Sequence, residues 1–368
     1  DENFDDDFLN GKNGHLLLIF YLYIQGLNQL NCEIKLVGDW KYPIEDIEII
    51  KKDWLKIQKK IKEGKAHELS EGDTFYLGAC TKGANSSSVR KQPFSEILAK
   101  QRAYSLKPNY VNHIIASIAN EPTNIYGKLI PSAVIAKKET IEEIVISKFK
   151  PLIGKSDKEL VKQFSLEFIN PKVKDYHSRV SKAIVKSVFG VPQNLKVADY
   201  IVEFNKAEII IKTVRLQENN LPKEDISFPT FKYEELVNED WENSDFKNIL
   251  EHKFLFVFFQ FEKEKLVLRK VKFWNMPYSD LLEVEKVWTK TQEIVAKGEI
   301  VQGFKTDKNG KMSRITNFPG KKFNSVAHVR PHTTNSSHTY PLPKVDKKTK
   351  EKEYTKHCFC LNNSYVRD

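Results

Sequence analysis

Two polar loops carry the side chains best suited to bind a polyanion. Residues 80–87 (Cys-Thr-Lys-Gly-Ala-Asn-Ser-Ser) and 330–337 (Arg-Pro-His-Thr-Thr-Asn-Ser-Ser) each combine a cationic donor with Asn, Ser and Thr. Lysine and arginine donate to guanine or to phosphate oxygens, and asparagine pairs with adenine. A solvated hairpin tip is the ordinary alternative for such clusters. Because the two loops occupy equivalent places in a repeated pattern, we favour a function in nucleic acid binding.

A lysine within an apolar run is the second candidate for chemistry. Residues 208–214 (Glu-Ile-Ile-Ile-Lys-Thr-Val) predict a buried strand that contains Lys212. A lysine in such a strand is costly unless it is paired. It resembles the last member of an acidic-x-Lys motif, in which carboxylates hold Mg²⁺ and the lysine assists the attacking water. The position two residues earlier is Ile210, so the motif is broken.

The elements that position these loops occur twice and in the same order. The matching blocks are residues 52–58 with Gly64 and 286–292 with Gly298, the two polar loops, and residues 104–106 with Tyr110 and 359–361 with Tyr365. The three offsets are 234, 250 and 255 positions. A period of this length is not that of a solenoid repeat. It predicts two copies of one globular fold.

Each copy mixes strands and helices, so we expect an α/β (α+β mixed) class. The predicted strands are residues 16–24 with 32–37 and 254–261 with 266–274, each pair forming a hairpin, and the predicted helices are 47–62, 140–149, 157–164, 178–189 and 284–296. Trp54 and Trp288 lie on the apolar faces of the first and last of these helices. We interpret both as core anchors.

The repeat also suggests how the chain is divided. Residues 1–120 would be the C-terminal part of the first copy, 121–138 a linker with Pro122, Gly127 and Pro131, and 139–368 the second copy. The second copy has well over a hundred residues before its tryptophan helix, whereas the first has about fifty. We therefore expect the front half of the first copy to precede Asp1.

Composition narrows the class only moderately. The chain has 368 residues, 40% hydrophobic and 11% aromatic, which is typical of globular proteins. The net charge of +10 favours a polyanionic partner weakly, since lysine-rich composition has other origins. The longest apolar runs are shorter than the roughly 20 residues that a bilayer requires. The four cysteines show no metal-ligand spacing, which favours a reduced, cytoplasmic setting, and we expect Cys358 and Cys360 to point to opposite faces of a strand.

The order of these motifs resembles a known family. Asp53-Trp54, Gly64, residues 82–85 and residues 104–110 resemble the C-terminal part of the MutH mismatch-repair endonuclease. The whole chain is similar to the two-domain type II restriction endonucleases of that family, which cleave GATC. The resemblance implies two tandem MutH-like, restriction-endonuclease-like domains. The first would be of the catalytic type, although incomplete here, and the second a degenerate DNA-binding copy.

The resemblance also assigns residues. The nuclease site of the family is an Asp, a Glu seven residues later and a Lys two further on, with another Glu on the preceding helix. In the second copy these positions hold Glu203, Ile210, Lys212 and Lys186. We therefore expect no catalytic and no metal-binding residue in this chain. The residues implied in DNA binding are Lys82, Asn85, Ser86, Lys107, Arg330, His332, Thr333 and Asn335.

The family's Arg-Pro-Lys tract, which reads bases, aligns with residues 80–82 and 330–332, and the first of these lacks the arginine. The function implied is Mg²⁺-dependent phosphodiester hydrolysis of double-stranded DNA at GATC, leaving a 5′-phosphate. A cognate methyltransferase is expected in the same system without direct contact, and no membrane is involved. The duplication favours double-strand cleavage or two-site control, and the chain as given is expected to be inactive. The alternatives are a non-catalytic sequence-specific DNA-binding protein, a MutH-like mismatch-repair nickase, and a scaffold without a nucleic acid partner.

Overall fold

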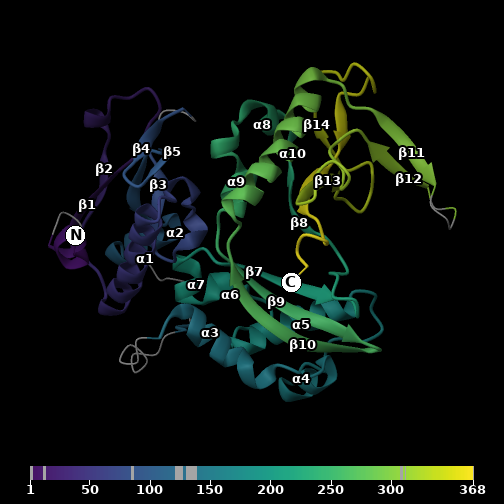
Figure 1. The fold of residues 1–368 in the computed structure, drawn as a ribbon, viewed down its shortest axis with the longest axis horizontal. Helices are drawn as coiled ribbons and strands as arrows, with labels where there is room; N and C mark the ends of the chain where they lie inside the picture. Colours follow the sequence, from purple (N-terminus) through teal and green to yellow (C-terminus); the bar gives the residue numbers. More distant parts are fainter. Residues whose placement is uncertain are drawn as a thin grey trace. The chain divides into compact units, whose positions relative to one another are not determined.

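The computed structural model describes residues 3–10, 14–83, 87–120, 127–129, 139–306, 310 and 312–367. Helices and short, mostly antiparallel strands alternate along these residues, so the predicted mixed α/β (α+β) class is confirmed (Figure 1). In the described part of the chain, no helix is both long enough and apolar enough to cross a bilayer.

The first copy consists of a hairpin, a long helix, two strand pairs and a final helix. Its elements are β1 (His15–Tyr21), β2 (Ile34–Lys41), α1 (Ile44–Lys62), β3 (Leu77–Thr81), β4 (Val89–Gln92), β5 (Ser95–Lys100), β6 (Arg102–Leu106) and α2 (Pro108–Ile118). β1 pairs with β2, which confirms the first predicted hairpin. β3 pairs with β6, and β4 pairs with β5.

α1 forms where the sequence places apolar side chains at helical spacing. Ile50, Trp54 and Ile57 are 0%, 4% and 3% exposed, which confirms Trp54 as a core anchor. The residue before Trp54 is also buried, because the Asp53 carboxylate accepts the backbone N–H groups of residues 75–77. These bonds fix the turn that leads into β3 and its polar loop.

The middle of the chain begins with helices, and capping residues in the sequence mark where two of them start. Its elements are α3 (Ile141–Phe149), α4 (Asp157–Gln163), α5 (Tyr176–Val188), α6 (Val197–Tyr200), α7 (Val202–Lys206) and β7 (Ile210–Leu216). Thr140 with Glu143, and Ser156 with Glu159, form capping boxes at α3 and α4. β7 starts two residues later than the predicted strand, because Glu208 has a φ of 53°, which is incompatible with a strand.

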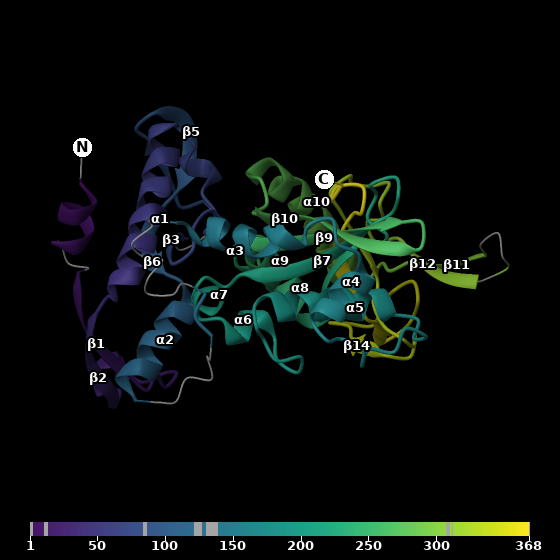
Figure 2. The same ribbon diagram turned by 90° about the horizontal axis from the view of Figure 1, so that it is seen from below.

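A three-stranded sheet has the order β10-β9-β7. β9 (Phe254–Glu262) and β10 (Lys265–Trp274) are the second predicted hairpin, which is confirmed. The first six residues of β9 are all buried, as the continuous apolar run indicated. Figure 2 shows α5 beside β7 of this sheet.

The last part of the chain carries the second tryptophan helix and its strand pair. Its elements are β8 (Ile226–Phe231), α8 (Tyr233–Asn238), α9 (Asp245–Leu250), α10 (Tyr278–Lys297), β11 (Gln302–Thr306), β12 (Met312–Thr316), β13 (Ala327–Pro331), β14 (Thr339–Pro341), β15 (Glu353–Thr355) and β16 (His357–Leu361). β13, β16 and β8 form one sheet in that order. Trp288 on α10 is 3% exposed, so it is a core anchor like Trp54.

The repeated sequence blocks correspond to repeated backbone geometry. In the first copy Ala79 pairs with Tyr104, and in the second Val329 pairs with Phe359. The offsets are 250 and 255 positions, as in the sequence match, and the other four pairs of each ladder keep them. Gly64 and Gly298, matched in sequence, follow their helices with positive φ angles of 71° and 64°.

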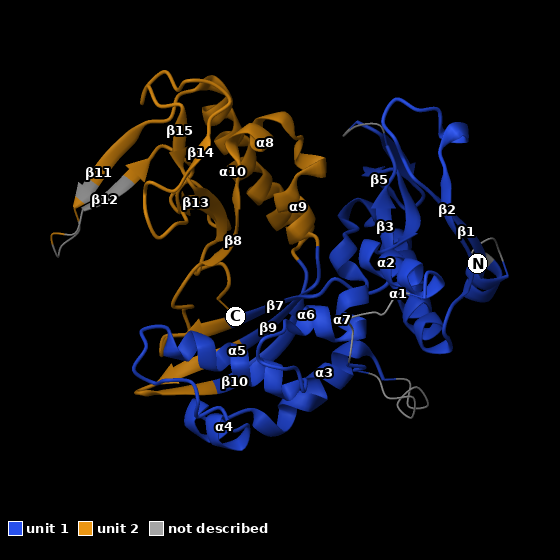
Figure 3. Ribbon diagram, turned by 180° about the vertical axis from the view of Figure 1, so that it is seen from behind, with its two compact units in different colours: residues 1–213, 252–257, 268–275 blue, residues 214–251, 258–267, 276–368 orange. Residues whose placement is uncertain are grey.

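The contact-based division differs from the predicted domain limits. One compact unit holds residues 1–213, 252–257 and 268–275 (unit 1), and the other holds 214–251, 258–267 and 276–368 (unit 2; Figure 3). Residues 139–213, although they belong to the second sequence copy, lie in unit 1 with the first copy. Buried contacts hold them there: Lys206 Nζ lies 2.7 Å from Asp46 Oδ2, and Lys107 Nζ donates to the Ala207 carbonyl. The predicted limits describe duplicated sequence and stay a prediction. Of the predicted linker, only residues 127–129 belong to the described part.

Candidate functional site

Arg330 is the most prominent cation of the predicted base-reading tract. It lies near the end of β13, opposite Cys358 of β16. Its side chain is 42% exposed, and its Nη1 lies 3.7 Å from Asp225 Oδ2. The Asp225 carboxylate therefore restrains the guanidinium, which remains accessible to solvent. This geometry suits a planar donor that must meet a base edge or a phosphate.

Asp225 gathers several groups of unit 2 around one carboxylate. Its Oδ1 lies 2.5 Å from Lys321 Nζ and accepts the Asn363 N–H at 2.9 Å, and its Oδ2 lies 3.7 Å from His328 Nε2. Burial raises the pKa of Asp225, but the hydrogen bonds from Lys321 and Asn363 outweigh this and leave that pKa lowered. Asp225 stays ionised at neutral pH and supports both Arg330 and Lys321. Asp225 was not predictable from the sequence, since it lies outside every repeated block.

The loop after Arg330 is organised by its own hydrogen bonds. Thr333 Oγ1 donates to the Asn335 carbonyl at 3.0 Å, and Asn335 Oδ1 accepts the Ser337 N–H at 3.0 Å. The Asn335 side chain is exposed, as is His332, whose pKa is lowered by burial and then by Arg330. The loop thus places an arginine, a neutral histidine and polar side chains close together on one segment.

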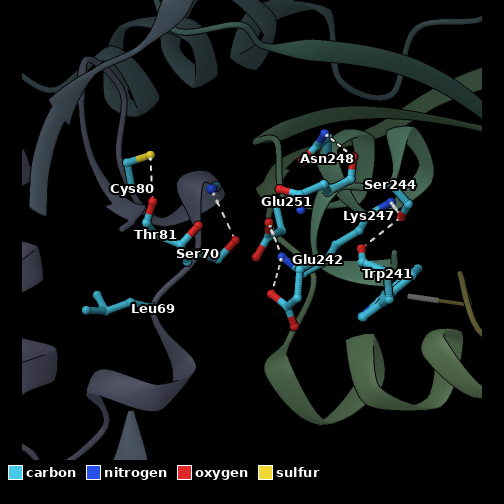
Figure 4. A network of polar contacts seen from close by, with 12 residues as sticks. Leu69, Ser70, Cys80, Thr81, Trp241, Glu242, Ser244, Lys247, Asn248 and Glu251 are labelled. Atoms are coloured by element: carbon cyan, nitrogen blue, oxygen red, sulfur yellow. Dashed lines mark hydrogen bonds and ion pairs between the residues drawn. The ribbon is translucent and has the colours of Figure 1, made fainter. Parts of the chain in front are cut away.

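The first-copy loop offers less. Lys82 is exposed, but Asn85 and Ser86 lie outside the described residues. Cys80 occupies the position that corresponds to Arg330, and its thiol points to the Thr81 carbonyl at 3.5 Å (Figure 4). A thiol cannot replace a bidentate guanidinium at guanine. Of the two corresponding positions, the one in the second copy holds a guanidinium.

Lys107 is a correction to the predicted DNA contacts. It is 2% exposed, and its Nζ donates to the carbonyls of Thr74 and Ala207, both at 3.1 Å. The counterpart of Lys107 in the second copy, Asn362, is equally buried and donates to the carbonyl of Asn324 at 2.8 Å. Both side chains tie the end of a strand to the turn before its partner strand. These contacts give Lys107 a structural role, and its burial contradicts the prediction that it contacts DNA.

The four positions that correspond to the nuclease site do not form a metal site. Lys186 Nζ donates to the Gln193 carbonyl at 2.6 Å, and Lys212 lies near the start of β7 with Ile210. The remaining acid, Glu203, is 5% exposed and accepts the Leu129 N–H at 2.8 Å. Lysine and isoleucine supply no ligand for Mg²⁺, which binds oxygen donors. The residues present do not fit the metal.

Among the residues that the structure describes, no group of three or more His, Cys, Asp or Glu side chains is placed to hold a metal ion. All four cysteines are free thiols.

The expectation for Cys358 and Cys360 is wrong. Their Sγ atoms lie 3.5 Å apart, because residues two apart on a strand share a face. The ladder of β16 with β8 is also irregular at this point. Both thiols are buried, and Cys358 lies opposite Arg330 in the ladder of β13 with β16.

Comparison with known proteins gives one informative relative. No family model matches the chain. The type II restriction enzyme Sau3AI of Staphylococcus aureus is 37% identical to it, and the alignment covers all of this chain and 79% of the relative.

Proposed function

The chain belongs to the type II restriction enzymes, and we propose that it recognises double-stranded DNA at the sequence GATC through its second copy. In this proposal both copies are MutH-like, and the complete activity is Mg²⁺-dependent hydrolysis of a phosphodiester. Support comes from the matching strand ladders of the two copies and from the motif order described above.

Arg330 is the observation that carries the proposal. It stands at the same ladder position in the second copy as Cys80 does in the first, and an ionised Asp225 supports it from below. A half-exposed guanidinium held in this way is suited to a bidentate bond with guanine O6 and N7. Thr333 and Asn335 follow on the same loop and would meet the thymine methyl or adenine.

We further propose that the second copy binds DNA without cutting it. Lys186 and Ile210 occupy positions where carboxylates would be required, whereas Lys212 matches the required lysine. Glu203 accepts a hydrogen bond from the Leu129 backbone, and Lys186 donates to the Gln193 carbonyl. The runner-up is a sequence-specific DNA-binding protein in which neither copy has catalytic activity. The same proposal includes a cytoplasmic location, which is consistent with four free thiols. It also includes a methyltransferase that protects GATC without direct contact with this protein.

A footprint tests the proposal directly. A labelled duplex with one GATC site and one CTAG site should show protection from DNase I centred on GATC when the chain is added without divalent metal. As the salt concentration is raised, protection of the GATC site should persist until the contacts to phosphate are lost on the whole duplex. Equal protection of both sites at all salt concentrations would reject GATC recognition.

A further inference from the structure

A lysine-lined cleft of about 770 Å³ lies in unit 1 among α5, α6 and the start of β7. Each of these neighbouring segments contributes a lysine. Lys182 and Lys186 come from α5, Lys196 precedes α6, and Lys212 comes from β7. Apolar side chains, among them Ile210, complete the wall. The cleft thus contains three of the four positions considered above, without Glu203.

The charge of this cleft is strongly one-sided. Among the described residues that line it, Asp199 is the one carboxylate, and its Oδ2 lies 3.9 Å from Lys196 Nζ. That contact is at the surface, where an ion pair is weak. Lysines of α5 and β7 line the same cleft, together with apolar side chains. A wall of low polarity strengthens the positive potential inside.

Two lysines of the cleft have lowered pKa values. Burial, and then the charge of Lys182, lowers the pKa of Lys186 and also that of Lys212. The bond from Lys186 to the Gln193 carbonyl holds its ammonium in place, and an ammonium has three donors, so two remain for another acceptor. An anion placed between the lysines would relieve the repulsion.

Two buried lysines elsewhere in the chain are matched with acids. Lys247 Nζ lies 2.6 Å from Glu251 and 3.8 Å from Glu242 in unit 2 (Figure 4). Lys206 is paired with Asp46. Among the described residues that line the lysine-lined cleft, there are four lysines and one carboxylate. A charge imbalance of this kind at a concave site indicates a ligand that brings its own negative charge.

We propose that the lysine-lined cleft binds a phosphate group directly, without a metal ion. A phosphate offers several acceptor oxygens and at least one negative charge, which matches lysine donors arriving from separate elements. The group could come from a DNA backbone or from a free phosphate compound, since both present the same oxygens.

The test uses the complete 368-residue chain and two probes. Pyrophosphate binding is measured by isothermal titration calorimetry, and binding of a 20-base-pair duplex without GATC by fluorescence anisotropy, both at low salt and without divalent metal. The site variant is Lys182→Gln with Lys212→Met. The matched control is Lys148→Gln with Lys158→Gln, because these two lysines are exposed on α3 and α4, outside the cleft.

We expect the site variant to weaken binding of at least one probe by about tenfold or more, and the control to change it about twofold or less. Loss for the duplex alone assigns the cleft to the DNA backbone, and loss for pyrophosphate alone assigns it to free phosphate compounds. Equal effects of both double variants, or no binding of either probe by the wild type, would overturn the proposal. Lys182→Gln alone, at an exposed position, should show a smaller loss in the same direction and guards against misfolding. Discrimination between GATC and CTAG duplexes is measured separately on the same variants, so failure here is distinguishable from failure of GATC recognition.

Discussion

Arg330 Nη1 lies 3.7 Å from Asp225 Oδ2, and the same carboxylate also binds Lys321. The carboxylate is 10% exposed, whereas the arginine is 42% exposed. One buried acid therefore supports two cations that reach solvent from β13 and from the segment before it. If Arg330 contacts DNA as proposed, a guanidinium restrained by this ion pair would lose less conformational freedom on binding.

Replacing Asp225 with Asn should reduce both stability and DNA discrimination. The neutral amide would leave Lys321, His328 and Arg330 without their shared negative charge. We expect the free energy of unfolding to fall by about 1–3 kcal/mol. Chemical denaturation measures the stability, and competition between GATC and CTAG duplexes measures the discrimination. Unchanged discrimination in a folded Asp225→Asn protein would mean that Asp225 does not position Arg330.

Lys107→Ala should destabilise the fold without weakening DNA binding by the folded protein. Its ammonium satisfies two buried carbonyls, and the change also leaves a cavity. We expect a loss of about 2–4 kcal/mol in the free energy of unfolding. Lys82→Ala is the comparison, because Lys82 is exposed on the polar loop and should have almost no effect on stability. A stable Lys107→Ala protein with weakened DNA affinity would restore the original assignment.

Lys253 should make stability rise with pH. Its side chain is buried, and burial, followed by the charge of Lys56, lowers its pKa from 10.5 to about 8. Between these values the unfolded chain binds more protons than the folded one, so unfolding becomes less favourable as pH rises. The contribution over the whole window is on the order of 3 kcal/mol. Denaturation at pH 7 and pH 10 should show a larger gain for the wild type than for Lys253→Met; parallel profiles would contradict the lowered pKa.

Local patterns in the sequence predicted much of the fold. Apolar spacing located α1 and α10 with Trp54 and Trp288, and apolar runs separated by polar turns located both hairpins, because these features depend on neighbours along the chain. The contacts of Lys107 depend on a carbonyl 100 residues away, so its burial was not predictable from its surroundings. For the same reason the sequence missed Asp225 and the lysine-lined cleft, whose members come from separate elements.

The second copy should not support metal-dependent cleavage. Its cleft holds Lys186, Ile210 and Lys212, and lysine charges repel Mg²⁺. Supercoiled plasmid incubated with the purified chain in Mg²⁺ or Mn²⁺ should remain intact across neutral pH. Nicking at GATC that survives removal of contaminating nucleases, and that disappears in Lys212→Ala, would contradict the assignment of the second copy as inactive.

The most direct test of the account is the affinity difference between a GATC duplex and a permuted duplex, measured for the wild type, Arg330→Lys and Arg330→Ala at one fixed salt concentration. The wild type should prefer GATC, and Arg330→Ala should lose about 1–3 kcal/mol on GATC with little change on the permuted duplex. Arg330→Lys should also lose discrimination, since lysine lacks the planar fork of arginine. Equal losses on both duplexes would make Arg330 a phosphate contact, and equal wild-type affinity for both would contradict GATC recognition itself.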